Sequence, residues 1–143
     1  SNFLILRKWC KVCRGVNKME KKNVLVVDDE PHIVHLISLS LNKDKYDVIP
    51  AYSGKEAMML VEQKTPDIII LDLMMPGLNG YELCELLRQD EKTKNTPVLI
   101  LSAKSQMHDK LTAIDVGADD YMTKPFDPME LVRRIKLNLD LIA

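Results

Sequence analysis

The residues best suited to chemistry in this chain stand directly after short apolar runs. Three runs occupy residues 23–27, 68–71 and 97–101, and a short predicted strand over 119–123, which begins with two aspartates, precedes Lys124. The polar side chains that follow or end them are Asp28, Asp29, Asp72, Ser102 and Lys124. An ionised carboxylate at the end of a buried run is costly unless a cation or hydrogen bonds compensate it. Asp72 therefore needs a cation or hydrogen-bond donors opposite it, and the ends of the other strands supply candidates.

Together these side chains could perform phosphoryl transfer. Three carboxylates within a few ångströms repel one another, so the group needs a divalent cation. Oxygen ligands favour a hard ion, which would be Mg²⁺ or Mn²⁺. Lys124 and the Ser102 hydroxyl could bind the oxygens of a phosphoryl group, and Asp72 could be the nucleophile that forms an acyl phosphate. Metal, lysine and backbone amides would neutralise the charge of the in-line transition state.

The elements that must position these residues alternate along the chain. Strands are predicted over 23–27, 47–51, 68–72, 97–101 and 119–123, and helices over 31–42, 54–63, 81–89, 107–116 and 128–141. This alternation predicts a mostly parallel sheet with helices on both faces, joined by right-handed crossovers. In such a sheet the carboxyl ends of all strands share one edge, where functional sites form. Pro50 indicates that the second strand lies at a sheet edge.

Helix signals and apolar spacing predict which residues face the core. Ser53 with Glu56 forms a capping-box pattern, Gly117 is suited to close a helix, and Asp127 is suited to cap the last one. The predicted inward residues are Ile33, Leu36, Ile37, Ser40 and Leu41 in the first helix, Leu83, Leu86 and Leu87 in the third, and Leu131, Val132, Ile135 and Leu139 in the last. Cys84 is interpreted as a small core residue.

Composition restricts the class of protein. The chain has 143 residues, a net charge of -1, 46% hydrophobic residues and 29% charged residues. This is ordinary for one globular domain. It argues against binding to a polyanion through bulk charge. No apolar run is long enough to cross a membrane. Three cysteines and the missing secretion signal favour a reducing cytoplasm.

Residues 1–22 form an N-terminal extension unlike the rest. Cys10 and Cys13 have the spacing of half a zinc site or of a redox pair, but no second pair completes a zinc site. The alternative is a basic arm that packs through apolar residues such as Trp9. His32 and His35 lie three apart on a predicted helix, where a metal pair competes with two solvated histidines.

The motifs taken together resemble a known family. Residues 23 to about 140 are similar to the receiver domain of two-component response regulators, so residues 23–143 are expected to be a phosphoacceptor domain. The matching motifs are Val26-Val27-Asp28-Asp29-Glu30, Leu71-Asp72-Leu73-Met74-Met75-Pro76, Leu101-Ser102-Ala103-Lys104 and Asp119-Asp120-Tyr121-Met122-Thr123-Lys124-Pro125-Phe126. The resemblance implies a flavodoxin-like α/β fold with strand order 2-1-3-4-5. It also implies that a sensor histidine kinase or a small phosphodonor phosphorylates Asp72.

The resemblance also assigns roles. Asp29 and Asp72 would bind Mg²⁺ directly with the Met74 carbonyl, and Asp28 would act through water. Ser102 would bond the phosphoryl oxygen and Lys124 would pair with it, after which Tyr121 would act as an aromatic switch. The Lys124–Pro125 bond is expected to be cis, which costs far less before proline than elsewhere. The domain would assist its own phosphorylation and dephosphorylation without being an enzyme.

The segment 118–121 resembles the winged-helix DNA-binding subfamily. In that subfamily the face made by residues 107–116, 119–123 and 128–141 forms intersubunit salt bridges. The matching residues here are Lys110, Asp115, Asp119, Glu130, Arg134 and Lys136. A homodimer through this face is therefore expected, against the alternative of a solvated charged surface. The output domain would be absent from this chain or on a partner, and this domain would not itself bind nucleic acid or membrane.

Three other functions compete with this one. A phosphohydrolase with an Asp nucleophile would use the same acyl phosphate, but such enzymes usually carry a second Asp where this chain has Met74. A flavodoxin-type binding module needs a phosphate-cradling loop after the first strand, where Asp28, Asp29 and Glu30 stand instead. An interaction domain that is never phosphorylated would not need the complete set of acids.

Overall fold

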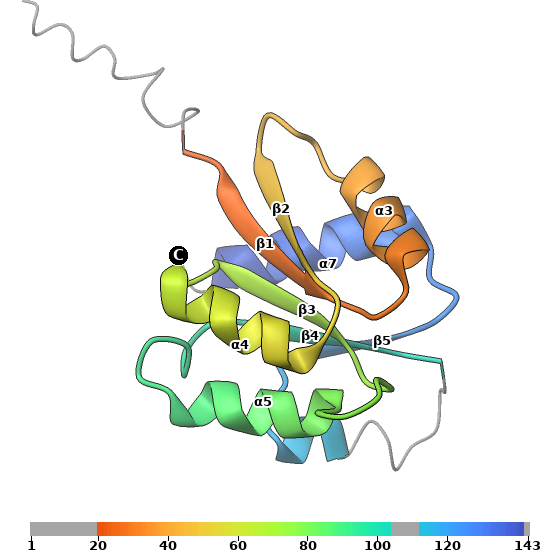
Figure 1. Cartoon of the computed structure of the whole chain (residues 1–143). Helices are drawn as coiled ribbons and strands as arrows, with labels where there is room; N and C mark the ends of the chain where they lie inside the picture. The colour runs from red at the N-terminus through yellow and green to blue at the C-terminus, as the bar shows by residue number, and fades with distance from the viewer. Residues whose placement is uncertain (1–19, 104–111, 142–143) are drawn as a thin grey trace, which may run out of the picture.

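A five-stranded parallel sheet forms the centre of the molecule (Figure 1). The structure is a computed structural model that describes residues 20–103 and 112–141. Its strands are β1 (Lys22–Val27), β2 (Tyr46–Ala51), β3 (Ile68–Asp72), β4 (Val98–Ser102) and β5 (Asp120–Thr123). They lie in the order β2-β1-β3-β4-β5, and every neighbouring pair is parallel. The predicted fold and strand order are therefore confirmed.

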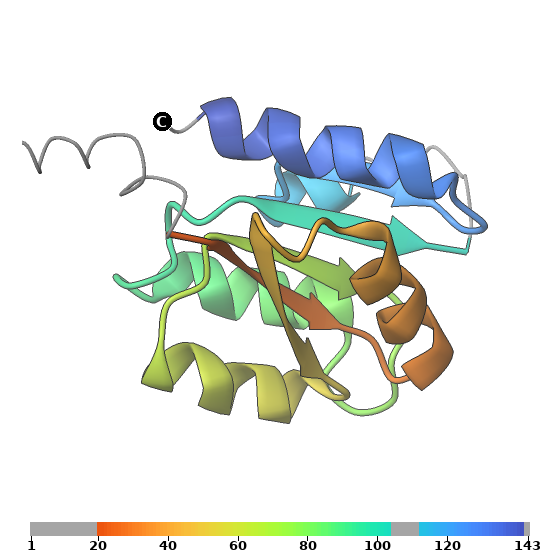
Figure 2. The same ribbon diagram turned by 90° about the horizontal axis from the view of Figure 1, so that it is seen from above.

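Helices cover both faces of the sheet (Figure 2). The helices α3 (Pro31–Ser40) and α7 (Pro128–Leu141) lie on one face, and α4 (Gly54–Gln63) and α5 (Gly80–Gln89) lie on the other. Residues 112–115 are helical and precede β5. Every residue of β3 and β4 is buried, as expected for central strands of a parallel sheet that is covered on both faces.

The two faces bury separate apolar clusters, because side chains alternate along a strand. Ile69 and Leu71 of β3 belong to the cluster under α4 and α5. Ile68 and Ile70 belong to the cluster under α3 and α7. The strand that ends at Asp72 therefore packs into both halves of the core, so the backbone of Asp72 is held from both sides.

Element ends agree with several sequence signals. Pro50 lies on the edge strand β2. The Ser53 side chain accepts a hydrogen bond from the Glu56 backbone at the start of α4, and the Asp127 carboxylate accepts one from the Met129 backbone at the start of α7. Gly117 has a positive φ of 96° after the helical residues 112–115, as a C-cap glycine requires.

Two predicted core residues are exposed instead. Leu36 and Leu86 are both 39% exposed, whereas their helices bury Val34 and Ile37 in α3 and Leu83, Cys84 and Leu87 in α5. Both errors have one cause: each Leu flanks the buried stripe of its helix, and apolar character alone does not distinguish a flanking Leu from an inward one. The helix α3 also ends two residues earlier than predicted, at Ser40. Cys84 lies in the core as predicted.

Several predictions concern residues outside the core. In the described part of the chain, no helix is both long and apolar enough to cross a membrane. Cys10, Cys13 and Trp9 in the N-terminal arm and Lys110 in the predicted dimer face lie outside the described residues. His32 and His35 are both exposed on α3.

Candidate functional site: an acidic crevice at the carboxyl edge of the sheet

The strand register brings the predicted site residues to one edge. Val27 of β1 pairs with Leu71 of β3, so Asp28 and Asp72 each follow at the same level. Asp72 pairs with Leu101 of β4, and Ser102 pairs with Thr123 of β5, immediately before Lys124. Groups that are far apart in sequence therefore meet because four parallel strands end together.

Three carboxylates lie close together at the carboxyl edge of the sheet, and we call the site that they form with Lys124 the acidic crevice. One oxygen from each of Asp28, Asp29 and Asp72 lies within 4.8 Å of the other two. Asp28 is 1% exposed and Asp72 is 5% exposed, whereas Asp29 faces solvent. This set of hard oxygen donors, partly buried and open on one side, fits a hard divalent cation such as Mg²⁺. Asp28 also accepts a hydrogen bond from the Glu30 backbone N–H at 2.9 Å, which orients its carboxylate.

Lys124 supplies a positive charge inside this group. Its Nζ lies 2.9 Å from Asp28 Oδ2, 3.3 Å from Asp72 Oδ1 and 3.8 Å from Glu30 Oε1. The Lys124 backbone N–H donates to the Ser102 carbonyl at 2.6 Å, which ties the residue to the end of β4. The following bond, Lys124–Pro125, is cis as predicted. Glu30 was not among the predicted site residues, although its position beside Asp28 and Asp29 was a signal for it.

The electrostatics of the crevice favour a proton or another cation on Asp72. Burial and the neighbouring Asp28 charge raise the pKa of Asp72 to about 6, against the opposing effects of Lys124 and a hydrogen bond from the Met74 backbone. Burial lowers the pKa of Lys124, but the hydrogen bond to Asp28 and the charges of Asp28 and Asp72 outweigh burial, and the net shift is upward. Lys124 is therefore a cation at neutral pH, and Asp72 is mostly ionised.

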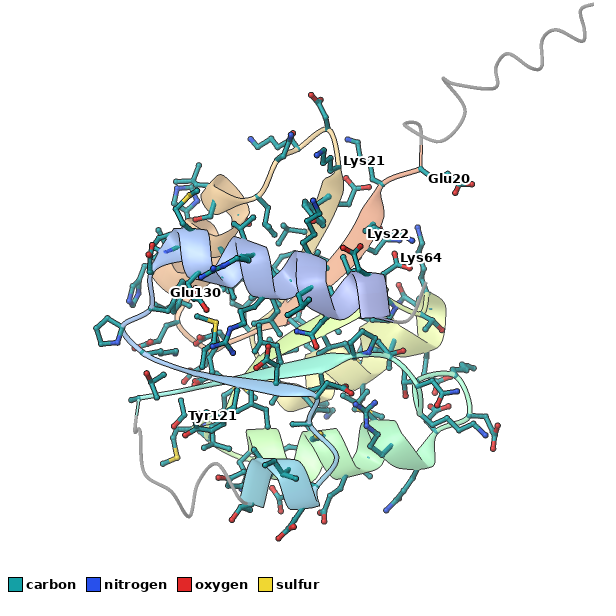
Figure 3. All side chains as sticks on the ribbon, turned by 180° about the vertical axis from the view of Figure 1, so that it is seen from behind. Glu20, Lys21, Lys22, Lys64, Tyr121 and Glu130 are labelled. Atoms are coloured by element: carbon teal, nitrogen blue, oxygen red, sulfur yellow. The ribbon has the colours of Figure 1, made fainter. Side chains whose placement is uncertain are left out.

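The remaining predicted residues lie around this centre. Ser102 is fully buried at the end of β4. The Met74 side chain is 63% exposed, while its neighbours Leu73 and Met75 are buried. Tyr121 is half-buried on β5 and packs against the cluster under α4 and α5. Figure 3 shows Tyr121 on the same side of the molecule as Glu130. In the same figure, Lys21, Lys22 and Lys64 lie near the beginning of β1 and are not part of this site.

The predicted dimer-face residues are partly engaged within the chain. Arg134 donates to Asp120 at 2.6 Å and to Glu130 at 2.8 Å, and Arg133 also pairs with Glu130. Asp115 and Lys136 are exposed. Asp120, which sequence reasoning did not single out, is the carboxylate that contacts Arg134.

Asp119 has a different set of contacts from the rest of that face. It accepts from Arg88 at 2.6 Å and from the Val98 backbone at 2.9 Å. Arg88 also donates to the carbonyls of Gly117 and Thr96. Asp119, the residue before β5, is therefore fixed to the end of α5 through Arg88 and to the start of β4 through Val98.

Comparison with known proteins agrees with this geometry. The family described as "Response regulator receiver domain" matches residues 24–136. The alkaline phosphatase synthesis transcriptional regulatory protein PhoP of Bacillus subtilis is 48% identical over 115 residues, which cover 80% of this chain and 47% of PhoP. The DNA-binding dual master transcriptional regulator RpaA of Synechocystis is 45% identical over 113 residues, covering 79% of this chain and 47% of RpaA. The chain thus spans about half the length of these curated relatives.

Solved structures show the same fold. The Francisella response regulator 1452 receiver domain has a TM-score of 0.79 and 36% identity, and the match covers 86% of this chain and all of that one (100%). The receiver domain of the Pseudomonas aeruginosa sensor histidine kinase PA1611 has a TM-score of 0.77 and 27% identity, with 85% and 99% coverage, and its structure has a magnesium ion coordinated in the active-site cleft. The two transcription regulators agree with the predicted resemblance to the winged-helix DNA-binding subfamily. The carboxylate crevice, the strand order and these matches agree, and this chain belongs to the response regulator receiver domain family.

Proposed function

We propose that this domain is a signalling switch controlled by phosphorylation of Asp72. The phosphoryl group would come from a sensor histidine kinase or from a small phosphodonor. One observation carries the proposal: Asp28, Asp29 and Asp72 lie together beside the Lys124 amine. The amine nitrogen is 2.9 Å from Asp28 Oδ2 and 3.3 Å from Asp72 Oδ1. Membership of the receiver family supports the same function, because receiver domains are phosphoacceptor signalling domains and not classical enzymes.

The chain's own residues would hold a divalent cation and orient the phosphodonor. Asp29 and Asp72 would bind Mg²⁺, or alternatively Mn²⁺, directly with the Met74 carbonyl, and Asp28 would act through water. When bound, this ion supplies positive charge that offsets the three carboxylates and the charge that develops on the transferred group. Lys124 would contact a phosphoryl oxygen from the opposite side, and the Ser102 hydroxyl would donate to another.

The transfer is an in-line displacement with a simple balance. An Asp72 carboxylate oxygen forms a bond to phosphorus while phosphorus breaks its bond to the donor, which is a kinase imidazole nitrogen or an acyl oxygen. The donor leaves with the electron pair of the broken bond. With a pKa of about 6 before any divalent cation binds, Asp72 is mainly ionised near pH 7, and a bound cation would favour the ionised form further. Water would later attack the acyl phosphate and regenerate the carboxylate.

The signal would leave through the face made by residues 107–116, β5 and α7. Movement of Ser102 toward the phosphoryl group would shift Tyr121 between two positions and bias a two-state equilibrium of this face. A cavity of about 190 Å³ lined by Ala113, Ala118, Tyr121 and Arg134 lies there, which leaves room for such a rearrangement. The face would then control an output domain or a partner protein in the cytoplasm, and nucleic acid would be bound by that output domain.

The same face would support a homodimer that forms on activation. Its proposed residues are Lys110, Asp115, Asp119, Glu130, Arg134 and Lys136. Arg134 would have to exchange its contact with Asp120 for one with the second copy. Analytical ultracentrifugation with and without beryllofluoride, a phosphoryl mimic, tests this. A dimer is expected only with the mimic, and a monomer under both conditions contradicts the dimer.

Intact-mass spectrometry tests the phosphorylation itself. The wild-type domain, incubated with acetyl phosphate and Mg²⁺, should gain one phosphoryl group, and Asp72→Asn should gain none. Asp47→Asn, which changes an exposed carboxylate on β2, is the matched control and should be modified like the wild type. Modification of Asp72→Asn at the wild-type rate would refute the assignment. Sustained release of phosphate from small phosphomonoesters would instead favour a phosphohydrolase.

A further inference from the structure

The loop between β3 and α5, residues 73–79, carries Met74 and packs closely against two glycines. Gly80 lies against the beginning of the loop, and Gly54 lies against Leu78 near its end. Gly80 is the first residue of α5, and Gly54 is the first residue of α4. Both are buried. Figure 1 shows this loop passing from the end of β3 to the start of α5, beside the first turn of α4.

At Gly80 the helix backbone approaches the backbone of Asp72 itself. A Cβ on Gly80 would lie 2.6 Å from the Asp72 carbonyl oxygen and 2.8 Å from the Leu73 Cα. These distances are well inside van der Waals contact. The side-chain carbon Leu71 Cδ1, also at 2.8 Å, could rotate away, but the backbone atoms of Asp72 at the end of β3 and of Leu73 just after it could not. The Gly80 N–H also donates to the Leu73 carbonyl at 3.1 Å. Gly80 therefore permits a close approach that any other residue would prevent.

At Gly54 a second helix approaches the far part of the same loop. A Cβ there would lie 2.9 Å from Leu78 Cδ2 and 3.0 Å from the Leu78 carbonyl oxygen. Rotation of the Leu78 side chain can relieve the contact with Cδ2, but the contacts with Leu78 Cβ and with the carbonyl oxygen, both at 3.0 Å, require the loop to move by a few tenths of an ångström. The conflict at Gly54 is therefore milder than the one at Gly80.

The position of this loop matters for the crevice. The Met74 backbone hydrogen-bonds the Asp72 carboxylate. The Leu73 N–H donates to the Leu101 carbonyl of β4 at 2.9 Å, so the loop begins at a fixed point and its next residue lies over the site. Gly80 therefore lies against the backbone of Asp72 and Leu73, the two residues that directly precede Met74.

We propose that Gly80 and Gly54 are positioning residues that set the β3–α5 loop so that Asp72 and the Met74 carbonyl can bind one divalent cation. This proposal rests on the proposed phosphoacceptor function and assigns two residues to it that touch neither the cation nor the phosphoryl group. A methyl group on Gly80 would push the Asp72 backbone or α5 by several tenths of an ångström. A misplacement of about 1 Å can cost about 100-fold in rate.

The test measures Mg²⁺ affinity and phosphorylation separately from folding. Mg²⁺ binding is measured by isothermal titration calorimetry, and phosphorylation by acetyl phosphate is measured by intact mass. Gly80→Ala should lose about tenfold or more in Mg²⁺ affinity and in phosphorylation rate, and Gly54→Ala should lose about two- to fivefold. The Met74 amide resonance in a ¹H–¹⁵N NMR spectrum should shift in both variants.

Two control variants separate positioning from general destabilisation. Leu139→Ala removes a core side chain of α7, on the other face of the sheet, and should lower the melting temperature without changing Mg²⁺ affinity. Gly77→Ala acts on the same loop through its positive φ of 76° alone, since nothing lies within 4 Å of a Cβ there, and should have less effect on Mg²⁺ affinity than Gly80→Ala. If Gly80→Ala does not fold, Gly54→Ala carries the test.

The outcomes distinguish this proposal from the proposed function. If wild type accepts phosphate while Gly80→Ala and Gly54→Ala match it in Mg²⁺ affinity and rate, the glycines have no positioning role and the function stands. If Leu139→Ala loses as much Mg²⁺ affinity as Gly80→Ala, the effect is one of stability and the positioning role is refuted. If wild type itself takes up no phosphoryl group, the proposed function fails.

Discussion

Two ionic clusters of this molecule differ in their balance of charge. In the crevice, the carboxylates of Asp28, Asp29 and Asp72 lie together, and the ammonium of Lys124 contacts those of Asp28 and Asp72. Between β5 and α7, two guanidinium groups face two carboxylates, and a buried amide completes their hydrogen bonds. The members of that second cluster are Asp120, Glu130, Arg133, Arg134 and Asn138.

The difference shows which cluster needs a ligand. Burial and, after it, the neighbouring Asp28 charge raise the pKa of Asp72 to about 6, so ionised Asp72 is unfavourable in the folded protein unless a further cation binds there. The cluster between β5 and α7 pairs each charge with an opposite one and is complete in itself. Changes to the first cluster should therefore alter binding and chemistry, and changes to the second should alter stability.

The largest effect should come from removing the ammonium of the crevice. Lys124→Met should slow phosphorylation by acetyl phosphate by about 100- to 1000-fold, because charge stabilisation of the transferred group is lost. Arg134→Met is the matched removal of a cation from the balanced cluster. In dilute, monomeric protein it should change the rate by less than about twofold, since Arg134 contacts none of the crevice groups. Equal losses in both variants would contradict the division into two kinds of cluster.

The balanced cluster should dominate in unfolding experiments. Asp120→Asn removes the carboxylate that Arg134 contacts at 2.6 Å and leaves Arg134 only its carboxylate contact with Glu130 at 2.8 Å. The free energy of unfolding should fall by about 1–3 kcal/mol, which urea denaturation measures. Asp47→Asn on the exposed edge strand is the control and should change it by less than about 0.5 kcal/mol. A neutral Asp120→Asn would mean that the cluster between β5 and α7 does not stabilise the fold.

In the crevice, removing a carboxylate charge should raise the free energy of unfolding, whereas Asp120→Asn should lower it. The pKa of Asp72 is raised from 3.8 to about 6 in the folded state. Its contribution to stability is therefore complete below about pH 4 and is lost as pH rises through about 6, where the folded protein must release the proton. Asp72→Asn cannot ionise, so in EDTA it should become more stable than wild type by about 1–2 kcal/mol as pH rises from 4 to 7. A difference that does not change with pH would refute the raised pKa assigned to Asp72.

A divalent cation should stabilise the ionised form of Asp72. At a Mg²⁺ concentration about ten times the dissociation constant, wild type should gain about 1.4 kcal/mol in the free energy of unfolding. Asp29→Ala removes a predicted ligand that is exposed. At the same Mg²⁺ concentration, the free energy of unfolding of this variant should rise by far less than that of wild type. NaCl at matched ionic strength is the control for screening. Equal stabilisation by NaCl and MgCl₂ would show that the crevice binds no specific ion.

The smallest effect should come from the edge of the crevice. Glu30 Oε1 lies 3.8 Å from Lys124 Nζ, and the Glu30 side chain is 52% exposed. Ion pairs with exposed partners contribute little. Glu30→Gln should therefore change stability by less than about 0.5 kcal/mol. A larger change in urea denaturation would place Glu30 among the essential charges of the crevice.

Much of the fold and the crevice could be predicted because strand ends carry a local signal. Asp28, Asp72 and Ser102 each stand where an apolar run stops, and Lys124 directly follows the short strand β5. Parallel pairing brings such strand ends together. The inward or outward direction of Leu36 and Leu86 could not be predicted, because a leucine beside a buried stripe resembles one within it. These errors concern the rotation of a helix about its axis and leave the topology unaffected.

Contacts between distant backbone segments left no signal in the sequence. Arg88 joins the end of α5 to Asp119 and to carbonyls of two separate loops, and no spacing of residues indicates such partners. Gly80 could be seen only as part of an Asn-Gly pair before a helix. Its contact with the Asp72 carbonyl depends on how closely α5 packs against β3, which requires coordinates.

The order in which the crevice residues occur along the chain has a consequence for synthesis. The aspartates come from the first and third strands in sequence, whereas Lys124 follows the last. A chain emerging from the ribosome therefore presents its acids well before their counter-charge, and since domains fold as units, a half-made protein has no assembled acceptor. If Asp72 is the phosphoacceptor proposed above, its site is complete only once the last strand has been made.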